Sequence, residues 1–186
     1  MLLRSVQNHS DAVVAFQTVK AGQRLSGIPD HSFFTRPVPS GKFLIDKETV
    51  GYGTDLDCSL QVFPTDETVR VTRPLFIFRE PRATYVSWLE NNLVPEKNPR
   101  LFIQAYRHVF FLALQAASLS SDSTITTYEQ LCDEPERVLR ALCKKWRIDF
   151  QQSMIDWKDD FDTTPLDAAG VRAGHYAAVA RGTTFH

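Results

Sequence analysis

The segment LFIFREPRATYVSW, residues 75–88, changes abruptly from an apolar run to a charged and polar one. The apolar run predicts a buried strand, and Pro81 suits the first turn of a helix, because its missing N–H has no intrahelical partner there. Tyr85, Trp88 and Leu89 give that helix one apolar face. A buried strand that leads directly into such a helix is typical of an α/β fold.

Other strand and helix patterns alternate along the 186-residue chain. They predict strands at 12–16, 43–46, 71–78 and 124–128, and helices at 2–8, from Pro81, at 99–117 and at 138–146. An Asp-x-x-Glu pattern at Asp133 and Glu136 predicts a cap for the last helix. Prolines and glycines in residues 21–42 predict an irregular loop. We therefore expect one α/β domain over residues 1–186, with a largely parallel sheet flanked by helices.

Composition narrows the classes of function. The formal net charge of -1 argues against a general nucleic-acid binder. No apolar run has the length of a signal peptide or of a membrane span, and the three cysteines form no CxxC pair. No His/Cys cluster has zinc spacing, and no Walker-type motif implies Mg²⁺. We expect a cytoplasmic protein without a metal, a nucleic-acid partner or a membrane partner, and the sequence leaves the oligomeric state open.

Arg79 and Ser87 suggest an anion site where the strand gives way to the helix. In open parallel sheets, ligands bind beyond the carboxyl ends of the strands, and a helix start there offers partial positive charge and free N–H groups. A guanidinium can bind a phosphate through two hydrogen bonds, and Ser87 lies eight residues after Arg79. The alternative is a surface arginine paired with Glu80 and a serine that caps the helix or faces water.

The same residues resemble the 3′-phosphate-binding strand and helix of the cytosolic-type sulfotransferase family. In that family a strand ends in Arg-Asp/Asn-Pro-Arg/Lys, and a serine follows eight residues after the first arginine; Glu80 departs from the usual Asp or Asn. The segment TITTYEQLCDEPERVLRALCKKW is similar to a second family motif, in which the tyrosine contacts the cofactor adenine. The resemblance implies a P-loop NTPase-like sulfotransferase fold, with 3′-phosphoadenosine-5′-phosphosulfate bound by Arg79, Ser87 and Tyr128.

Two further segments bear on catalysis and on the 3′-phosphate. FLIDKET is similar to the family strand that carries catalytic groups, and the resemblance assigns Lys47 to the leaving phosphate. Thr49 stands where the family has a histidine base, so Glu48 or a nearby histidine would deprotonate the acceptor. The alternative is a Lys-Glu pair on a solvated turn at the end of a strand. Arg181 and Gly182 are similar to a late basic-Gly segment that contacts the 3′-phosphate. His31, in the loop at 21–42, is a candidate for substrate contact, whereas His108 is expected to be a packed structural histidine.

The beginning of the chain resembles the sequence that follows the phosphosulfate-binding loop in this family. MLLRSVQNHSDAV is similar to LLRSxLNxHPDV, so the loop and the first strand would lie upstream of Met1, and the C-terminal part would also be abbreviated. The order of motifs most resembles sulfotransferase-like proteins of fungal secondary metabolism. Three functions remain open: sulfuryl transfer to a hydroxyl or amine of a small molecule, a degenerate fold that acts as a binding protein or as a cyclase or isomerase, and a fragment of a longer active enzyme.

Overall fold

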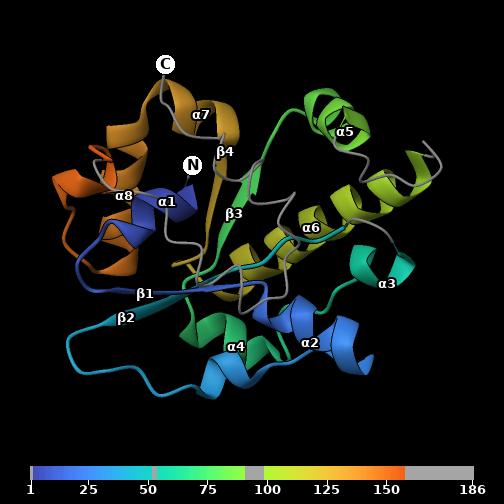
Figure 1. The fold of residues 1–186 in the computed structure, drawn as a ribbon, viewed down its shortest axis with the longest axis horizontal. Coiled ribbons are helices and arrows are strands. Elements are labelled where there is room, and N and C mark those ends of the chain that lie inside the picture. Colours follow the sequence, from blue (N-terminus) through green and yellow to red (C-terminus); the bar gives the residue numbers. More distant parts are fainter. Residues whose placement is uncertain (1, 52–53, 91–98, 158–186) are drawn as a thin grey trace. The chain divides into compact units, whose positions relative to one another are not determined.

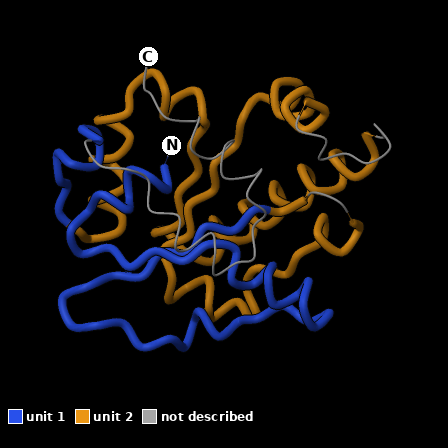
Figure 2. Tube along the Cα trace, in the orientation of Figure 1, with its two compact units in different colours: residues 1–49, 149–186 blue, residues 50–148 orange. Residues whose placement is uncertain are grey.

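The computed structural model describes residues 2–51, 54–90 and 99–157 (Figure 1). The chain divides into two compact units: unit 1 comprises residues 1–49 and 149–186, and unit 2 comprises residues 50–148 (Figure 2). Each unit contains a two-stranded parallel sheet and helices, so the predicted α/β class is confirmed, with the strands in two small sheets. The single domain over residues 1–186 stays a prediction.

Unit 1 is built around strands β1 and β2. Its elements are α1 (Leu2–Gln7), β1 (Ala12–Phe16), α2 (Thr18–Ser26), the 3₁₀ turn η1 (Ser32–Thr35), β2 (Phe43–Lys47) and η2 (Gln152–Met154). The two strands pair in parallel, with Ala12 opposite Phe43 and Phe16 opposite Lys47. A parallel pair needs a crossover connection, and α2 with η1 provides it.

Helix α2 begins at an unusual backbone turn. Gln17, which precedes it, has a left-handed conformation with φ 51°, and its own side chain makes no capping hydrogen bond. The first N–H groups of the helix are instead satisfied by strand β2 and the residue that follows it: Thr18 N donates to Asp46 Oδ2 at 3.2 Å, and Val19 N donates to Glu48 Oε1 at 2.7 Å. The carboxylates at the end of β2 therefore cap α2.

Unit 2 contains strands β3 and β4 and the longest helix. Its elements are α3 (Asp55–Cys58), α4 (Asp66–Val71), β3 (Leu75–Phe78), α5 (Pro81–Glu90), α6 (Pro99–Leu119), β4 (Thr124–Thr127), α7 (Tyr128–Asp133) and α8 (Pro135–Trp146). The strands pair in parallel from Leu75–Thr124 to Phe78–Thr127. Helices α5 and α6 connect them along the chain (Figure 1).

Helix α6 takes part in two apolar clusters of unit 2. One cluster joins α5 to α6 and consists of buried Cys58, Trp88, Phe102 and Ala105, with Tyr85 and Leu89 packed against it. The other joins β3 to α6 and consists of buried Val69, Phe76, Ala113 and Ala116. Trp88 of α5 and Phe76 of β3 both pack against α6, so this helix fixes the positions of the strand and the helix on either side of Arg79.

The structure corrects three predictions about the elements. Val71 ends helix α4, so the third strand begins only at Leu75, after Pro74. Residues 21–42 are less irregular than predicted, since α2 runs to Ser26 and η1 follows. Asp133 does not cap the last helix: Glu134 is the N-cap residue, without a side-chain capping bond, and the capping box belongs to Thr127 and Gln130 at the start of α7.

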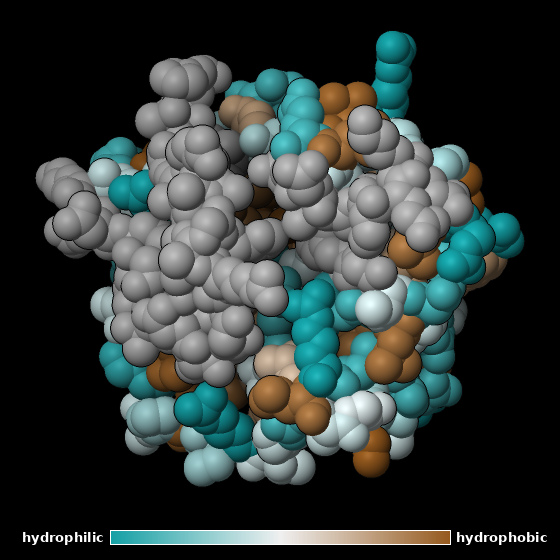
Figure 3. Space-filling model, turned by 45° about the vertical axis from the view of Figure 1, so that its right-hand side comes forward, coloured by the Kyte–Doolittle hydropathy of each residue, from teal (hydrophilic) through white to brown (hydrophobic). Residues whose placement is uncertain are grey.

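The surface of the described residues mixes hydrophobic and hydrophilic side chains. On the face drawn in Figure 3, hydrophobic residues form small groups separated by hydrophilic ones. Among the described helices, α6 included, none combines the length and the apolar character that crossing a membrane requires.

Candidate functional site

Arg79 and Tyr128 are brought together by the pairing of β3 with β4. Phe78 and Thr127 are opposite each other at the ends of the two strands, so the residues that follow them are neighbours. The guanidinium carbon of Arg79 lies 5.0 Å from the centre of the Tyr128 ring, a cation–π contact. Two residues that the family resemblance assigns to one ligand are therefore in contact in unit 2.

The backbone around Arg79 is anchored by two hydroxyl groups. Tyr106 in α6 donates its hydroxyl to the Arg79 carbonyl at 3.0 Å, and the Thr84 hydroxyl donates to the Glu80 carbonyl at 3.0 Å, with the Arg79 carbonyl at 3.4 Å as a second, longer acceptor. Burial raises the pKa of Tyr106, and the nearby Glu129 and Glu80 carboxylates raise it further. Burial also raises the pKa of Tyr128, with Cys132 as the next cause, whereas Arg79 opposes the shift.

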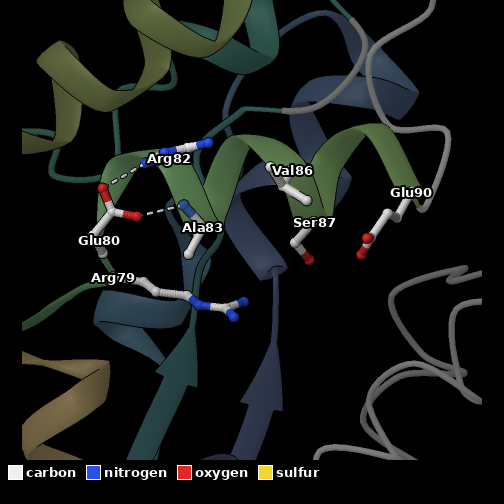
Figure 4. Close-up of a pocket in the computed structure, with 7 residues that line it drawn as sticks. All are labelled: Arg79, Glu80, Arg82, Ala83, Val86, Ser87 and Glu90. Atoms are coloured by element: carbon white, nitrogen blue, oxygen red, sulfur yellow. Dashed lines mark hydrogen bonds between the residues drawn. The ribbon is translucent and has the colours of Figure 1, made fainter.

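A pocket of about 350 Å³ lies along one flank of α5. We call it the α5 pocket; it is lined by Arg79, Glu80, Arg82, Ala83, Val86, Ser87 and Glu90. Figure 4 shows the Arg79 guanidinium, the Ser87 hydroxyl and the Glu90 carboxylate on the same side of the helix, with the Arg82 side chain on the other side. Arg79 and Ser87, eight residues apart in the sequence, thus line one cavity.

The start of α5 does not offer free N–H groups, contrary to the expectation from the sequence. The Glu80 carboxylate accepts hydrogen bonds from Arg82 N at 2.9 Å and from Ala83 N at 2.6 Å, and the Glu80 carbonyl accepts from Thr84 N at 2.9 Å. The two backbone N–H groups hold the pKa of Glu80 below its ordinary value. Glu80 therefore occupies the helix start as a capping anion, and an anionic ligand would depend on the side chains of the pocket.

The residues that line the α5 pocket include two arginines and two glutamates, and the side chain of one of them, Arg82, lies on the other side of the helix. Glu80 is already stabilised by the helix N-terminus, which leaves Glu90 as the carboxylate that an anionic ligand would meet. The Arg79 guanidinium has no hydrogen-bond or ion-pair partner among the described residues, and the Tyr128 ring is its cation–π partner. Arg79 is exposed, so its N–H groups can reach a ligand.

Lys47, Glu48 and Asp46 lie together at the end of β2 in unit 1. Lys47 Nζ donates to Thr49 Oγ1 at 2.7 Å and lies 4.8 Å from the centre of the Phe16 ring. Fully buried Lys20 donates to the Thr49 carbonyl at 2.9 Å. Thr49, which stands where the sulfotransferase motif has a histidine, therefore supplies acceptors to two lysines.

Asp46 and Glu48 form a carboxyl pair beneath the start of α2. Asp46 is in β2 and Glu48 is the first residue after the strand, and the two side chains are hydrogen-bonded to each other. Burial raises the pKa of Glu48 to about 8, and the charge of Asp46 adds to this shift. Burial also raises the pKa of Asp46, so the pair holds one proton at neutral pH. Desolvation lowers the pKa of Lys47, although Lys47 is an exposed residue whose ammonium keeps part of its hydration.

The remaining candidates have separate positions. His31 precedes η1 in unit 1, where its ring lies 6.1 Å from that of Phe34. Nε2 of His108 in α6 lies 2.9 Å from the carbonyl of Leu60 in unit 2. Arg181 and Gly182 lie outside the described residues. Searched within residues 2–51, 54–90 and 99–157, no group of His, Cys, Asp or Glu side chains is placed to hold a metal ion.

Sequence reasoning missed Asp46 and the capping role of Glu80. The spacing of Asp46 and Glu48 is a signal for the first, because residues i and i+2 of a strand point to the same face. Glu80 stands three residues before Ala83, which is the spacing of an N-cap residue. In the comparison with the sulfotransferase motif, however, Glu80 stands out only because it replaces the usual Asp or Asn.

No family model, curated protein or solved structure matches this chain.

Proposed function

We propose that this chain is a sulfotransferase-like protein whose unit 2 binds the adenosine 3′-phosphate end of 3′-phosphoadenosine-5′-phosphosulfate in the α5 pocket. The observation that carries the proposal is the common cavity lined by Arg79 and Ser87, with Tyr128 in contact with the same guanidinium. A phosphate in this cavity would accept hydrogen bonds from two N–H groups of Arg79 and from the Ser87 hydroxyl. The face of Tyr128 that Arg79 leaves uncovered would stack on the adenine ring.

The reaction proposed for such a protein is transfer of the sulfuryl group to a hydroxyl or amine of a small molecule, as in secondary metabolism. Lys47 would stabilise the leaving phosphate, Glu48 would take the acceptor proton, and His31 would contact the acceptor. The largely parallel sulfotransferase sheet and the cytoplasmic location belong to the same proposal.

Binding without transfer is the second candidate, and the position of Glu48 favours it. One oxygen of Glu48 accepts the Val19 N–H, and the carboxyl group shares a proton with Asp46. A base must be deprotonated and within reach of the acceptor, whereas this group caps a helix and is protonated at neutral pH. A structural role for Glu48 would leave the nucleotide site of unit 2 intact.

Calorimetric titration with adenosine 3′,5′-bisphosphate and with adenosine 5′-phosphate tests the proposal. We expect the bisphosphate to bind more tightly and the Arg79→Ala variant to lose most of that preference. Hydrogen bonds to charged groups contribute about 1.5–3 kcal/mol, so the bisphosphate should bind roughly tenfold to a hundredfold more weakly to the variant.

Arg82→Ala is the matched control. Arg82 lines the same pocket, but its side chain lies on the other side of α5, so we expect a change of about twofold or less. Equal losses in both variants would mean that general charge attracts the nucleotide. The absence of bisphosphate binding to the unmodified chain would rule out the proposal. Incubation with the labelled sulfate donor and a panel of phenols and amines then separates transfer from binding alone.

A further inference from the structure

A second pocket, of about 420 Å³, lies in unit 2 where β4 begins. We call it the α8 pocket; it is lined by Asp122, Thr124, Ala141, Lys144, Lys145 and Arg147. Its walls are the turn before β4 and the last turn of α8. Thr124 is the first residue of β4, whereas Tyr128 follows the other end of the strand, so the α8 pocket and the Arg79–Tyr128 contact lie at opposite ends of β4.

The α8 pocket carries an excess of positive charge. Three of its lining residues are cationic, and the single carboxylate, Asp122, is shared by Arg147 at 3.1 Å and Arg73 at 3.7 Å. Lys145 Nζ donates to the Ser121 carbonyl at 2.7 Å. The Lys144 ammonium has no hydrogen-bond or ion-pair partner among the described residues. The only carboxylate of the pocket, Asp122, is thus already paired with arginines, whereas the Lys144 ammonium is available to a ligand.

The end of α8 does not account for all of these cations. Cations near a helix C-terminus stabilise its exposed carbonyl groups. Here the backbone N–H of Arg147 contacts the Cys143 and Lys144 carbonyls, Ile148 N donates to Cys143 O at 3.0 Å, and Arg73 donates to Trp146 O at 2.6 Å. The carbonyl groups of Cys143, Lys144 and Trp146 are therefore satisfied without the Lys144 ammonium.

The hydroxyl group of Thr124, which also lines the α8 pocket, is a second and independent observation that points to a ligand. Its Oγ1 atom is buried and has no hydrogen-bond partner within the described part of the chain. Buried hydroxyl groups are usually hydrogen-bonded, because leaving one unpaired costs free energy. The Thr124 hydroxyl must change its χ1 rotamer to donate to an oxygen atom bound in the α8 pocket.

We propose that the α8 pocket binds a small phosphate monoester. The phosphate oxygens would accept hydrogen bonds from the Lys144 ammonium, the Arg147 guanidinium and the Thr124 hydroxyl. Ala141 and the methylene stems of Lys144 and Lys145 would cover the apolar part of the ester. This site is separate from the proposed nucleotide site and does not depend on it.

A ¹⁵N–¹H NMR titration of the full chain with phenyl phosphate tests the proposal, since backbone shifts locate the ligand. We expect saturable shifts at Asp122–Thr124 and at residues 141–147, and an affinity at least threefold higher than that of inorganic phosphate. Lys144→Gln should weaken binding about fivefold or more. Arg107→Gln is the matched control, because Arg107 is an exposed helical cation of unit 2 outside both pockets, and it should leave the affinity unchanged.

Thr124→Val keeps the size of the side chain and removes the hydroxyl. Because Oγ1 has no partner in the described part of the fold, this variant should fold normally and bind phenyl phosphate more weakly. Arg79→Ala should leave the shifts of the α8 pocket unchanged, which separates this proposal from the nucleotide site. Shifts confined to the α5 pocket, no saturable shifts, equal affinities for phenyl and inorganic phosphate, or unchanged binding by Lys144→Gln would each overturn the proposal.

Discussion

Replacement of Glu48 by glutamine should make the stability of unit 1 less dependent on pH. The side-chain carbonyl of the substituted glutamine can still accept the Val19 N–H, and its amide can donate to Asp46, so the contacts of the carboxyl pair are retained. What the variant loses is the ability to ionise. The perturbation therefore tests the proton held by the Asp46–Glu48 pair rather than the packing of α2.

The sign and the size of the effect follow from the pKa of Glu48. Below its ordinary value of 4.5 the group is protonated in both states, and between 4.5 and about 8 the folded state holds a proton that the unfolded state has released. Stability therefore falls as pH rises through this range. Full burial would set an upper limit of about 5 kcal/mol, but partial exposure and sharing with Asp46 reduce the expected effect to about 1–2 kcal/mol.

Urea denaturation and hydrogen exchange of residues 18–26 at pH 5.5, 7 and 8.5 measure this effect. We expect the Glu48→Gln variant to gain about 1–2 kcal/mol relative to the unmodified chain between pH 5.5 and 8.5. Hydrogen exchange reports α2 alone, which matters because two units need not unfold together. Glu67→Gln, which removes an exposed carboxylate paired with Arg70, serves as the control and should give a constant difference. A constant difference for Glu48→Gln as well would refute the raised pKa.

Two further predictions concern unit 2. Glu90→Gln should tighten the binding of adenosine 3′,5′-bisphosphate about twofold to threefold in calorimetry, because it removes a like charge from the α5 pocket; weaker binding would show that the carboxylate contacts the ligand favourably. Gly51→Ala should lower the free energy of unfolding by about 2–4 kcal/mol in urea titrations, since Gly51 has φ 101° and an added Cβ would lie 2.4 Å from the Trp88 ring. Unchanged stability of the latter variant would mean that Trp88 can move away without cost.

The sequence was sufficient for elements whose signal is local. Strand β1 has the predicted bounds, and α5 begins at Pro81 as expected, because an apolar run and a first-turn proline each specify their own structure. The sequence predicts the third strand too early, because Val71 and Thr72 have high β propensity, whereas in the structure the Thr65 cap starts a helix that ends at Val71. Short β-branched runs are ambiguous until their capping contacts are known.

The candidate site was predictable where it depends on segments that are close in sequence. Arg79 lies between β3 and α5, and Ser87 lies less than two helical turns after Pro81, so a strand that leads directly into a helix brings both residues to one pocket. The use of the α5 N-terminus depends on the rotamer of Glu80, and the capping of α2 by Asp46 and Glu48 depends on how β2 meets α2. Contacts between segments that are distant in sequence have no local signal, so the role of Glu48 was not predictable.

The two proposed sites of unit 2 should influence each other through charge. β4 has four residues, so its ends are about 10 Å apart; if each ligand lies next to its end of the strand, two dianions in water repel by about 1.7 kcal/mol, which is the upper limit of the coupling. A Debye length of about 8 Å at physiological salt reduces this to about 0.5 kcal/mol, or roughly a twofold loss of affinity. Phenyl phosphate should thus weaken bisphosphate binding slightly, and by linkage the reverse should hold equally. The coupling should disappear in about 1 M salt, where the Debye length is about 3 Å. Because screening removes only electrostatic coupling, an effect that persisted at high salt would show instead that β3 and β4 change conformation when one pocket is filled.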